Sequence, residues 1–394
     1  MTGGNGRIIP APLAGRDYCQ LSGSVLGSAD RQSEPLETGA AGESSTLANA
    51  GHRLTRFFDL PGHAGERPQG GSLDLHGDTG QRAMRLAALE AEFAEAARPE
   101  DQGDRLYDWS GALLFDRDGE GDDRPEIDRS ALRDILLASL ASDTVRWGSR
   151  VTSIEPDGSD FLIAGKRFEM IVGADGAWSR VRPLLSEAEP GYEGVAFAEL
   201  GFETAMHPDI AALTGRGKMF AVGENRALIT QLNGHGHIRG YAGLRAPEAV
   251  AQHWASLESE PLRAALLKVF EGWAPPLLRV IETGTIIGPR PLYALPIGHR
   301  WTSRPGVTLI GDAAHLMWPF AGEGVDLALA DAADLAEALA SGGGWAAIAA
   351  HEAAMAARAA VAAERSAAGL RAVFSAAGSA PVLDHYRERL GADV

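Results

Sequence analysis

The chain has 394 residues, of which 45% are hydrophobic and 23% are charged, as in an ordinary globular protein with a sizeable core. Acidic residues outnumber basic ones by 53 to 36, and the net charge of −17 argues against binding to nucleic acid or to an anionic membrane. No apolar run approaches the roughly 20 residues of a membrane span, and a single cysteine, Cys19, excludes an internal disulfide. We therefore expect a soluble, cytoplasmic protein.

The first 46 residues differ from the rest, because they are rich in glycine, serine, alanine and proline and show no clear period. The stretch 30–45 has almost no aliphatic residues, which is typical of a loop or a disordered insertion. Regular structure is expected from about Leu47, with a short strand over 54–58 that ends at Asp59.

The next part of the chain shows alternating helix and strand signals. Apolar spacing predicts one amphipathic helix over 81–97. Asp128 is a good N-cap for a second helix, whose apolar residues recur at helical spacing. A short apolar strand over 168–172 then runs directly into an Asp-Gly turn.

The middle of the chain, 188–280, alternates like antiparallel strands and includes a helical stretch over 250–272. The end of the chain is predicted to hold a buried strand over 307–310 and alanine-rich helices over 326–340 and 345–374. Strands and helices at both ends around an antiparallel middle predict an α/β nucleotide-binding domain that is interrupted by a substrate domain.

The strongest motif combines residues 309–315, a strand that ends in Gly311-Asp312, with the Pro/Gly loop 319–324. Glycine lets a cofactor approach the backbone, and an aspartate can accept hydrogen bonds from sugar-like hydroxyls. The loop leads into a helix, whose N-terminal N–H groups stabilise negative charge. A plain strand–loop–helix connection is the alternative, and the length of the whole run argues against it. His315 is expected to be a structural histidine that is packed or hydrogen-bonded.

Three further motifs are weak when taken alone. Asp175-Gly176 forms a tight turn after a strand, Gly70-Gly71 precedes a short strand, and Arg129 begins a helix, where it could pair with phosphate or a polar ring edge. An ordinary turn and a solvated helix arginine are the alternatives. His235 and His237 flank a glycine in a hairpin turn, and we expect a surface turn there rather than a metal site.

In this order, the four motifs resemble those of the group A FAD-dependent monooxygenases, and especially the tetracycline-inactivating branch and the aromatic-polyketide hydroxylases. The resemblance covers residues 47–394. It implies a fold of the p-hydroxybenzoate hydroxylase type: a Rossmann-like, α/β FAD-binding domain, an inserted antiparallel β-sheet substrate domain, and a C-terminal helix that bridges the two. The implied segments are 1–81, 124–187 and 281–344 for the FAD-binding domain, 82–123 and 188–280 for the substrate domain, and 345–394 for the C-terminal helical segment.

The resemblance also implies a cofactor site for FAD, with NADPH or NADH as electron donor and O2 as the second substrate. In that family the arginine at Arg129 contacts the flavin cofactor, the Asp-Gly turn lies near the pyrophosphate, and the aspartate after Gly311 holds the ribityl chain. The Pro/Gly loop lies against the isoalloxazine ring, and Asp59 would hold the adenosine ribose. The implied cofactor residues are Asp59, Arg129, Asp175, Gly176, Gly311, Asp312, Pro319, Gly322 and Gly324.

The expected substrate is an aromatic or polyketide-like small molecule. Arg226 lies in a segment that faces the substrate in the family, and a solvated strand face is an equally weighted alternative. Trp318 and Phe320 stand beside the Pro/Gly loop and could form an apolar wall for an aromatic ring. No side chain is assigned as a dedicated acid or base, and no metal is expected. Phe202, Trp273 and Tyr293 are expected in the core.

The chain departs from the family at its start, where no GxGxxG loop is present. Residues 7–15 align best with that loop, but Pro10 and Pro12 stand at the first two glycines, and proline lacks the N–H that a phosphate needs. Three accounts stay open: an altered N-terminal sequence, a relative that has lost tight FAD binding, or weak FAD binding through the other motifs. The alternative functions are a non-redox cyclase or isomerase and a drug-sequestering protein.

Overall fold

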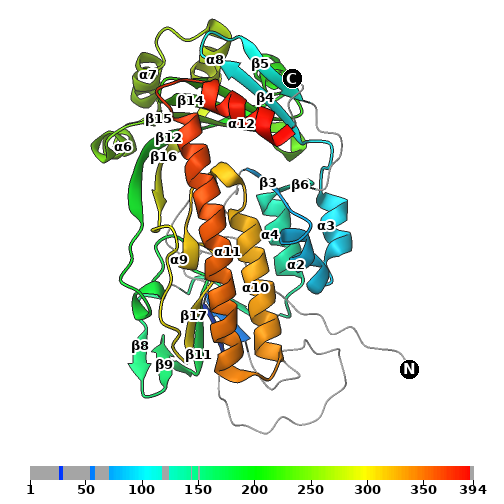
Figure 1. Ribbon diagram of the computed structural model, residues 1–394, viewed down its shortest axis with the longest axis vertical. Coiled ribbons are helices and arrows are strands. Elements are labelled where there is room, and N and C mark those ends of the chain that lie inside the picture. Colours follow the sequence, from blue (N-terminus) through cyan, green and yellow to red (C-terminus); the bar gives the residue numbers. More distant parts are fainter. Residues whose placement is uncertain are drawn as a thin grey trace.

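The computed structural model describes residues 26–29, 54–57, 71–117, 124–142, 144–149 and 151–390. The proline-containing stretch 7–15, Gly70 and Asp59 lie outside the described residues, so the interpretations placed on them stay predictions. The fold is of mixed α/β type, with two main sheets at opposite ends of a pair of long helices (Figure 1).

A five-stranded sheet joins segments that are far apart in the sequence. Its strand order is β17-β11-β1-β2-β7. β11 pairs in parallel with β17, and β2 pairs in parallel with β7, whereas β1 is antiparallel to both of its neighbours. The strands are β1 (Leu26–Ala29), β2 (Leu54–Phe57), β7 (Val145–Arg146), β11 (Met170–Gly173) and β17 (Val307–Leu309).

β1 corrects the expectation that regular structure begins near Leu47. The four residues of β1 are mostly small and show no apolar alternation, so the sequence pattern gives no sign of a strand. The strands predicted over 54–58 and 307–310 are present as β2 and β17. A small antiparallel sheet of β8 (Glu155–Asp157), β9 (Asp160–Ile163) and β10 (Lys166–Phe168) precedes β11, and Phe161 and Phe168 are buried there.

The second main sheet has seven strands in the order β16-β12-β15-β14-β13-β4-β5. All neighbours are antiparallel except β4 and β13, which are parallel. The antiparallel middle predicted from the sequence is therefore present. The strands are β4 (Gly103–Asp108), β5 (Leu113–Arg117), β12 (Gly191–Glu203), β13 (Gly217–Gly223), β14 (Arg226–Leu232), β15 (His237–Arg245) and β16 (Thr285–Ala294).

The two faces of this sheet have different neighbours, because successive side chains of a strand point to opposite faces. One face packs against the helices α5 (Pro208–Thr214), α6 (Glu248–Ala255), α7 (Ser259–Val269) and α8 (Pro275–Thr283), and buries side chains such as Leu200 and Met219. The other face carries Phe197, Val222 and Tyr241, which pack with Trp318, Phe320 and the end of a long helix. We call the second one the inner face.

Shorter elements pack beside the helix that begins at Gly324. β3 (Ser72–Asp74) pairs antiparallel with β6 (Glu126–Asp128), and the helices α2 (Gly80–Leu86), α3 (Glu90–Ala96) and α4 (Arg129–Ala138) pack beside them. The described residues also form the short 3-10 helices η1 (Arg182–Leu184), η2 (Gly234–Gly236) and η3 (Pro319–Ala321).

The helix predicted over 81–97 is two helices, which corrects the sequence interpretation. α2 ends in a Schellman-type turn: Ala88 has a φ of 54°, and the N–H groups of Ala88 and Leu89 donate to the carbonyls of Arg85 and Met84. Glycine usually occupies the left-handed position of such a turn. Because alanine stands there in this chain, the sequence does not indicate that the helix ends. Met84, Leu89 and Phe93 keep the predicted apolar spacing, because all three pack into one cluster across the break.

Two long helices connect the ends of the molecule. α10 (Gly324–Ala340) and α11 (Gly344–Val373) run side by side through its centre, and α12 (Ala380–Leu390) lies beside the seven-stranded sheet (Figure 1). Among the described residues, no helix has the combination of length and apolar character that crossing a membrane requires.

Candidate active site

The end of β17 holds the Gly-Asp motif in a backbone conformation that requires glycine. Gly311 has a φ of 59° and a ψ of −144° and immediately precedes the short helix α9 (Asp312–His315). A Cβ atom at Gly311 would lie 3.1 Å from the Cβ of Ala328 on α10. Both the left-handed backbone and the close approach of α10 therefore select glycine at this position.

Asp312 is the chemically most informative residue of the site. Its side chain is 7% exposed, and its Oδ2 atom is buried without a hydrogen-bond partner among the described residues. Burial raises the pKa of Asp312 to about 7, against the opposing charges of His315, Arg129 and Arg182. Leaving a buried acceptor unsatisfied costs about 1–3 kcal/mol. A ligand hydroxyl that donated to Oδ2 would remove this cost, so the residue suits the ribityl chain of FAD.

The charge of Arg129 acts on the Asp312 carboxyl and opposes the rise of its pKa. Arg129 is the first residue of α4, and its backbone N–H donates to the carbonyl of Gly71 at 3.2 Å. The structure therefore brings the Gly71, Arg129 and Gly-Asp segments together, although they are far apart in the sequence.

Asp128 precedes α4 as predicted, but its side chain does not cap the helix. Instead the Asp128 carboxylate accepts a hydrogen bond from the Gly234 N–H at 2.9 Å and pairs with Arg98 at 2.8 Å. Asp128 therefore ties α4 to the turn between β14 and β15. This turn contains η2. His235, for which we expected a surface turn, lies in η2, and His237 follows it as the first residue of β15. The described residues hold no group of three His, Cys, Asp or Glu side chains placed to bind a metal ion.

The Pro/Gly loop closes the site from the other side. Pro319 begins η3, Gly322 has a φ of 71°, and Gly324 is the first residue of α10. A Cβ at Gly322 would lie 3.3 Å from the Asp74 Oδ1 of β3, so the loop and the Gly71–Asp74 run face each other. Free N–H groups at the start of α10 favour a ligand oxygen that carries negative charge.

The Asp-Gly turn at Asp175 is held by its own side chain. Asp175 Oδ1 accepts a hydrogen bond from Ser179 Oγ at 2.5 Å, and Oδ2 accepts one from the Arg180 N–H at 2.6 Å. Burial raises the pKa of Asp175, while these hydrogen bonds oppose the rise. Gly176 has a φ of 77°, and a Cβ there would meet nothing within 4 Å. The backbone of Gly176 is thus open, whereas both Asp175 oxygens already have partners.

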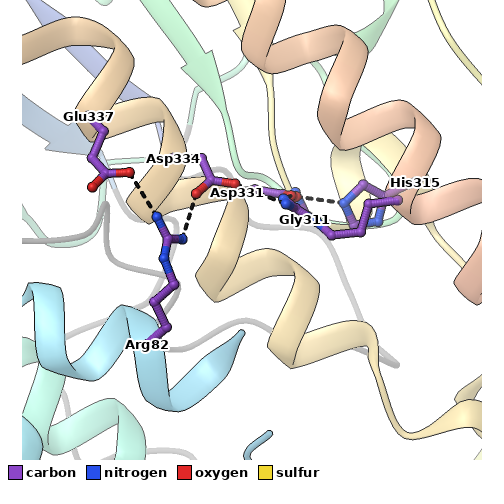
Figure 2. A network of polar contacts seen from close by, with 7 residues as sticks. Arg82, Gly311, His315, Asp331, Asp334 and Glu337 are labelled. Carbon is purple, nitrogen blue, oxygen red and sulfur yellow. Dashed lines mark hydrogen bonds and ion pairs between the residues drawn. The ribbon is translucent and has the colours of Figure 1, made fainter. Parts of the chain in front are cut away.

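Behind the Gly-Asp motif lies a polar network that the sequence reasoning missed (Figure 2). Its centre is Asp331 of α10, which is 0% exposed. Asp331 Oδ2 accepts hydrogen bonds from the Gly311 N–H at 3.0 Å and from His315 Nε2 at 2.6 Å, and Oδ1 pairs with Arg358 of α11 at 2.9 Å. Burial alone would raise the pKa of Asp331, but His315 and its other partners outweigh burial and lower it.

Asp331 therefore fixes the backbone of Gly311 one residue before Asp312. His315 is the hydrogen-bonded structural histidine that the sequence led us to expect. The network continues outward through Asp334, which pairs with Arg358 at 2.9 Å and with Arg82 at 2.6 Å. Asp331 stands 19 residues after Asp312, on the next long helix. The only sequence signal for its role is its position on the helix face that is expected to be buried.

The structure does not bring Arg226 to the inner face of the seven-stranded sheet. Arg226 Nη1 donates to the carbonyl of Val269 at 2.5 Å, and its guanidinium lies 5.8 Å from the centre of the Trp273 ring, on the helix-covered face. Arg226 therefore stabilises the packing of α7 and β14, which corrects its assignment to the substrate. Phe202 and Trp273 lie in the core as expected, whereas Tyr293 is half-buried.

Trp318 and Phe320 do lie against the inner face. The Phe320 ring is 6.4 Å from Phe197 of β12 and 6.0 Å from Phe374 at the end of α11. Trp318 is buried, and its Nε1 atom has no partner among the described residues. These side chains form an aromatic wall between the Pro/Gly loop and the sheet.

A second polar group lies between β3, β6 and the inner face, and the sequence reasoning missed it as well. Lys218 of β13 lies 3.4 Å from the buried carboxylate of Glu126, and the charge of Asp74 is the main cause that raises the pKa of Lys218. Asp326, in the first turn of α10, accepts hydrogen bonds from the backbone N–H groups of His76 and Gly80. Burial raises the pKa of Asp326 to about 7.

Comparison with known proteins agrees with this geometry. Residues 294–367, which include the Gly-Asp motif and the Pro/Gly loop, match the FAD binding domain family. The chain is 32% identical to the monooxygenase asqM of Emericella nidulans over 324 residues, which cover 68% of this chain and 73% of that protein. This chain belongs to the group A FAD-dependent monooxygenases. A similar relative is the monooxygenase penA of Penicillium thymicola, at 29% identity over 68% of this chain and 74% of penA.

Solved structures support the fold of this monooxygenase. A variant of Klebsiella pneumoniae HpxO complexed with FAD has a TM-score of 0.68 at 19% identity, covering 87% of this chain and 89% of the other. The tetracycline destructase Tet(51) has a TM-score of 0.65 at 15% identity, covering 87% of this chain and 90% of the other. The resemblance and the fold of the p-hydroxybenzoate hydroxylase type are confirmed, and the chain is an FAD-dependent monooxygenase.

Proposed function

We propose that this monooxygenase hydroxylates an aromatic or polyketide-like small molecule, with NADPH or NADH as electron donor. The observation that carries the cofactor assignment is the buried, unpartnered Oδ2 of Asp312 beside the left-handed Gly311 and the start of α10. These groups fit FAD, because they offer an acceptor for a ribityl hydroxyl and N–H donors for a flavin oxygen.

FAD, when bound, supplies the activation of O2 that allows one oxygen atom to enter an organic substrate. The residues of this chain then have three tasks. Asp312 and Arg129 bind and orient the cofactor, while Asp331 holds the backbone of Gly311 in place. The N-terminus of α10 would stabilise negative charge on a bound flavin ring.

The aromatic wall of Phe197, Trp318, Phe320 and Phe374, which Tyr241 extends, supports a flat substrate. The phenylalanine and tyrosine rings pack edge-on or tilted against one another. Phe197, Trp318 and Phe374 are buried, so the half-buried Phe320 and Tyr241 are the rings that a substrate would contact. Proteins of the same fold include a salicylate hydroxylase and tetracycline destructases, which act on ring compounds. Lys218 and Glu126 lie where the inner face meets β3 and β6. Burial raises the pKa of Glu126, so this carboxyl suits proton exchange with a substrate hydroxyl, while Lys218, whose pKa is raised, stays charged and donates hydrogen bonds.

The test is the visible absorption spectrum of the purified protein before and after addition of FAD and removal of the excess. We expect a bound-flavin spectrum, followed by consumption of O2 that depends on both NAD(P)H and an aromatic substrate. Asp312→Asn keeps the size of the side chain and should weaken FAD retention, while Asp108→Asn, in a distant turn, should not. A protein that stays colourless would instead favour a non-redox cyclase or isomerase, or a protein that returns its ligand unchanged.

A further inference from the structure

Three charged side chains form a cluster on the inner face of the seven-stranded sheet. Glu199 of β12 lies between Arg239 of β15 and Arg290 of β16. Strand alternation settles their orientation, because Ala198 and Leu200, on either side of Glu199, pack into the helix-covered core. Glu199 therefore shares the inner face with Phe197.

The cluster holds one more positive charge than negative. Arg239 Nη1 lies 2.9 Å from Glu199 Oε1, and Arg290 Nε lies 2.6 Å from Glu199 Oε2, so each carboxylate oxygen has one arginine. The side chains of Arg239, Glu199 and Arg290 are 15%, 9% and 21% exposed. Each guanidinium has five N–H donors. Apart from the ion pairs with Glu199, the two guanidinium groups make one further hydrogen bond in the described structure, from Arg290 Nη1 to the Pro289 carbonyl at 3.3 Å.

The cluster borders the aromatic wall. Tyr241 stands opposite Glu199 in the β12–β15 register, and Phe197, two residues before Glu199, packs against Phe320 of the Pro/Gly loop. Gly201 stands opposite Arg239, so β12 places no side chain beside that arginine. A flat molecule lying on the aromatic wall would thus have unused arginine donors at its edge.

A surplus cation here is not explained by the sheet alone. One arginine is enough to neutralise Glu199. The second, half-buried arginine loses part of its hydration, and no second carboxylate compensates this cost. The chain as a whole carries a net charge of −17, which repels anionic ligands at long range. A local positive surplus beside the proposed substrate surface offsets that repulsion for one ligand group.

We propose that Arg239 and Arg290 recognise a carboxylate group on the aromatic substrate. Arginine donors form short, paired hydrogen bonds with such oxygens, and Glu199 holds both guanidinium groups at a fixed separation. This inference rests on the proposed function, because it names the class of substrate for the same surface. It predicts that the preferred substrates are acids at neutral pH.

The test compares aromatic acids with their primary amides, which have the same shape without the charge. Binding of a matched set, including salicylate and salicylamide, is measured by titration calorimetry on the protein after incubation with FAD and removal of the excess. We expect at least one acid to bind about ten-fold or more tightly than its amide, which corresponds to about 1.4 kcal/mol. Equal binding of acids and amides, or no binding by any acid, would overturn the proposal.

Variants separate recognition from a purely structural role. Arg239→Gln and Arg290→Gln should each weaken binding of the acid by about ten-fold and change amide binding little. Glu199→Gln removes the competing carboxylate and should strengthen acid binding, which a structural role alone would not produce. Arg239→Lys keeps the charge and covers the case in which the glutamine variant fails to fold. Arg279→Gln, an exposed arginine on α8, is the matched control and should change neither ligand.

Failure of this inference is distinguishable from failure of the proposed function. FAD occupancy is read from the absorption spectrum of the same samples, and NAD(P)H-dependent O2 consumption reports the reaction. A flavin-loaded, active protein that binds acids and amides equally would overturn the anion site alone. A protein that prefers acids but holds no flavin would overturn the proposed function alone.

Discussion

Replacing Asp331 by alanine should destabilise the protein and loosen the cofactor loop, although Asp331 itself does not face the cofactor. Its carboxylate is fully buried and has three partners: the Gly311 N–H at 3.0 Å, His315 at 2.6 Å and Arg358 at 2.9 Å. Removing one partner of a buried ion pair costs about 3–5 kcal/mol, because the remaining charge is left uncompensated. Arg358 keeps Asp334 at 2.9 Å, so we expect a loss near the lower end, about 3 kcal/mol.

The assay is urea unfolding of the FAD-free protein followed by circular dichroism, with FAD affinity measured in parallel. Asp334→Ala is the matched control. Asp334 is on the same helix and pairs with Arg82 and Arg358, but it is 24% exposed, and exposed pairs contribute about 0–1 kcal/mol. If both variants lost the same small free energy, or if Asp331→Ala left FAD affinity unchanged, the role of Asp331 in holding Gly311 would be refuted.

Other predictions follow from the same site. Asp312→Ala should lower FAD affinity by about ten- to one-hundred-fold, the equivalent of one hydrogen bond to a charged group, in an equilibrium titration of flavin fluorescence. Gly311→Ala should cost about 1–3 kcal/mol, because its φ of 59° disfavours a side chain, whereas Gly324→Ala, where a Cβ meets nothing within 4 Å, should cost little in the same urea assay. The pKa of Asp312 is about 7 in the folded FAD-free protein and 3.8 in the unfolded chain. Between these values the folded protein keeps a proton that the unfolded chain has released. The stability that Asp312 contributes is therefore complete below pH 3.8 and is lost as the pH rises through 7. Asp312→Asn should therefore gain stability relative to the unsubstituted protein between pH 5 and pH 8, and a constant difference across that range would contradict the shift. Arg226→Ala should lower the unfolding midpoint without changing substrate affinity, because its partners are Val269 and Trp273.

The parts of the site that are local in sequence could be predicted, and those that depend on distant contacts could not. Gly311, Asp312 and the Pro/Gly loop form one strand–loop–helix unit, so their spacing alone indicates a cofactor site. Asp331 reaches that unit only because α10 folds back on β17. The contact between Lys218 and Glu126 likewise depends on how the β3–β6 pair meets the seven-stranded sheet.

Errors in the sequence interpretation have identifiable physical causes. Arg226 follows a two-residue turn in which Asn225 has a φ of 55°, and a shift of one residue in that turn would send its side chain to the inner face. Asp128 has a typical capping position but binds Arg98 and Gly234 instead, because β14 and β15 bring that turn close. Ala88 adopts the left-handed conformation that glycine normally marks.

The long helix α11 also determines how the molecule can move. Its 30 residues span about 45 Å, and Ile348 and Met355 pack with the five-stranded sheet while Leu370 and Val373 pack with the inner face of the other. Near its end, a Cβ at Gly369 would lie 2.8 Å from the Cβ of Phe320, so the helix and the Pro/Gly loop interlock. A single continuous rod fixed at both ends opposes hinge bending between the two sheets. We therefore expect that a cross-link between the two sheets leaves turnover intact.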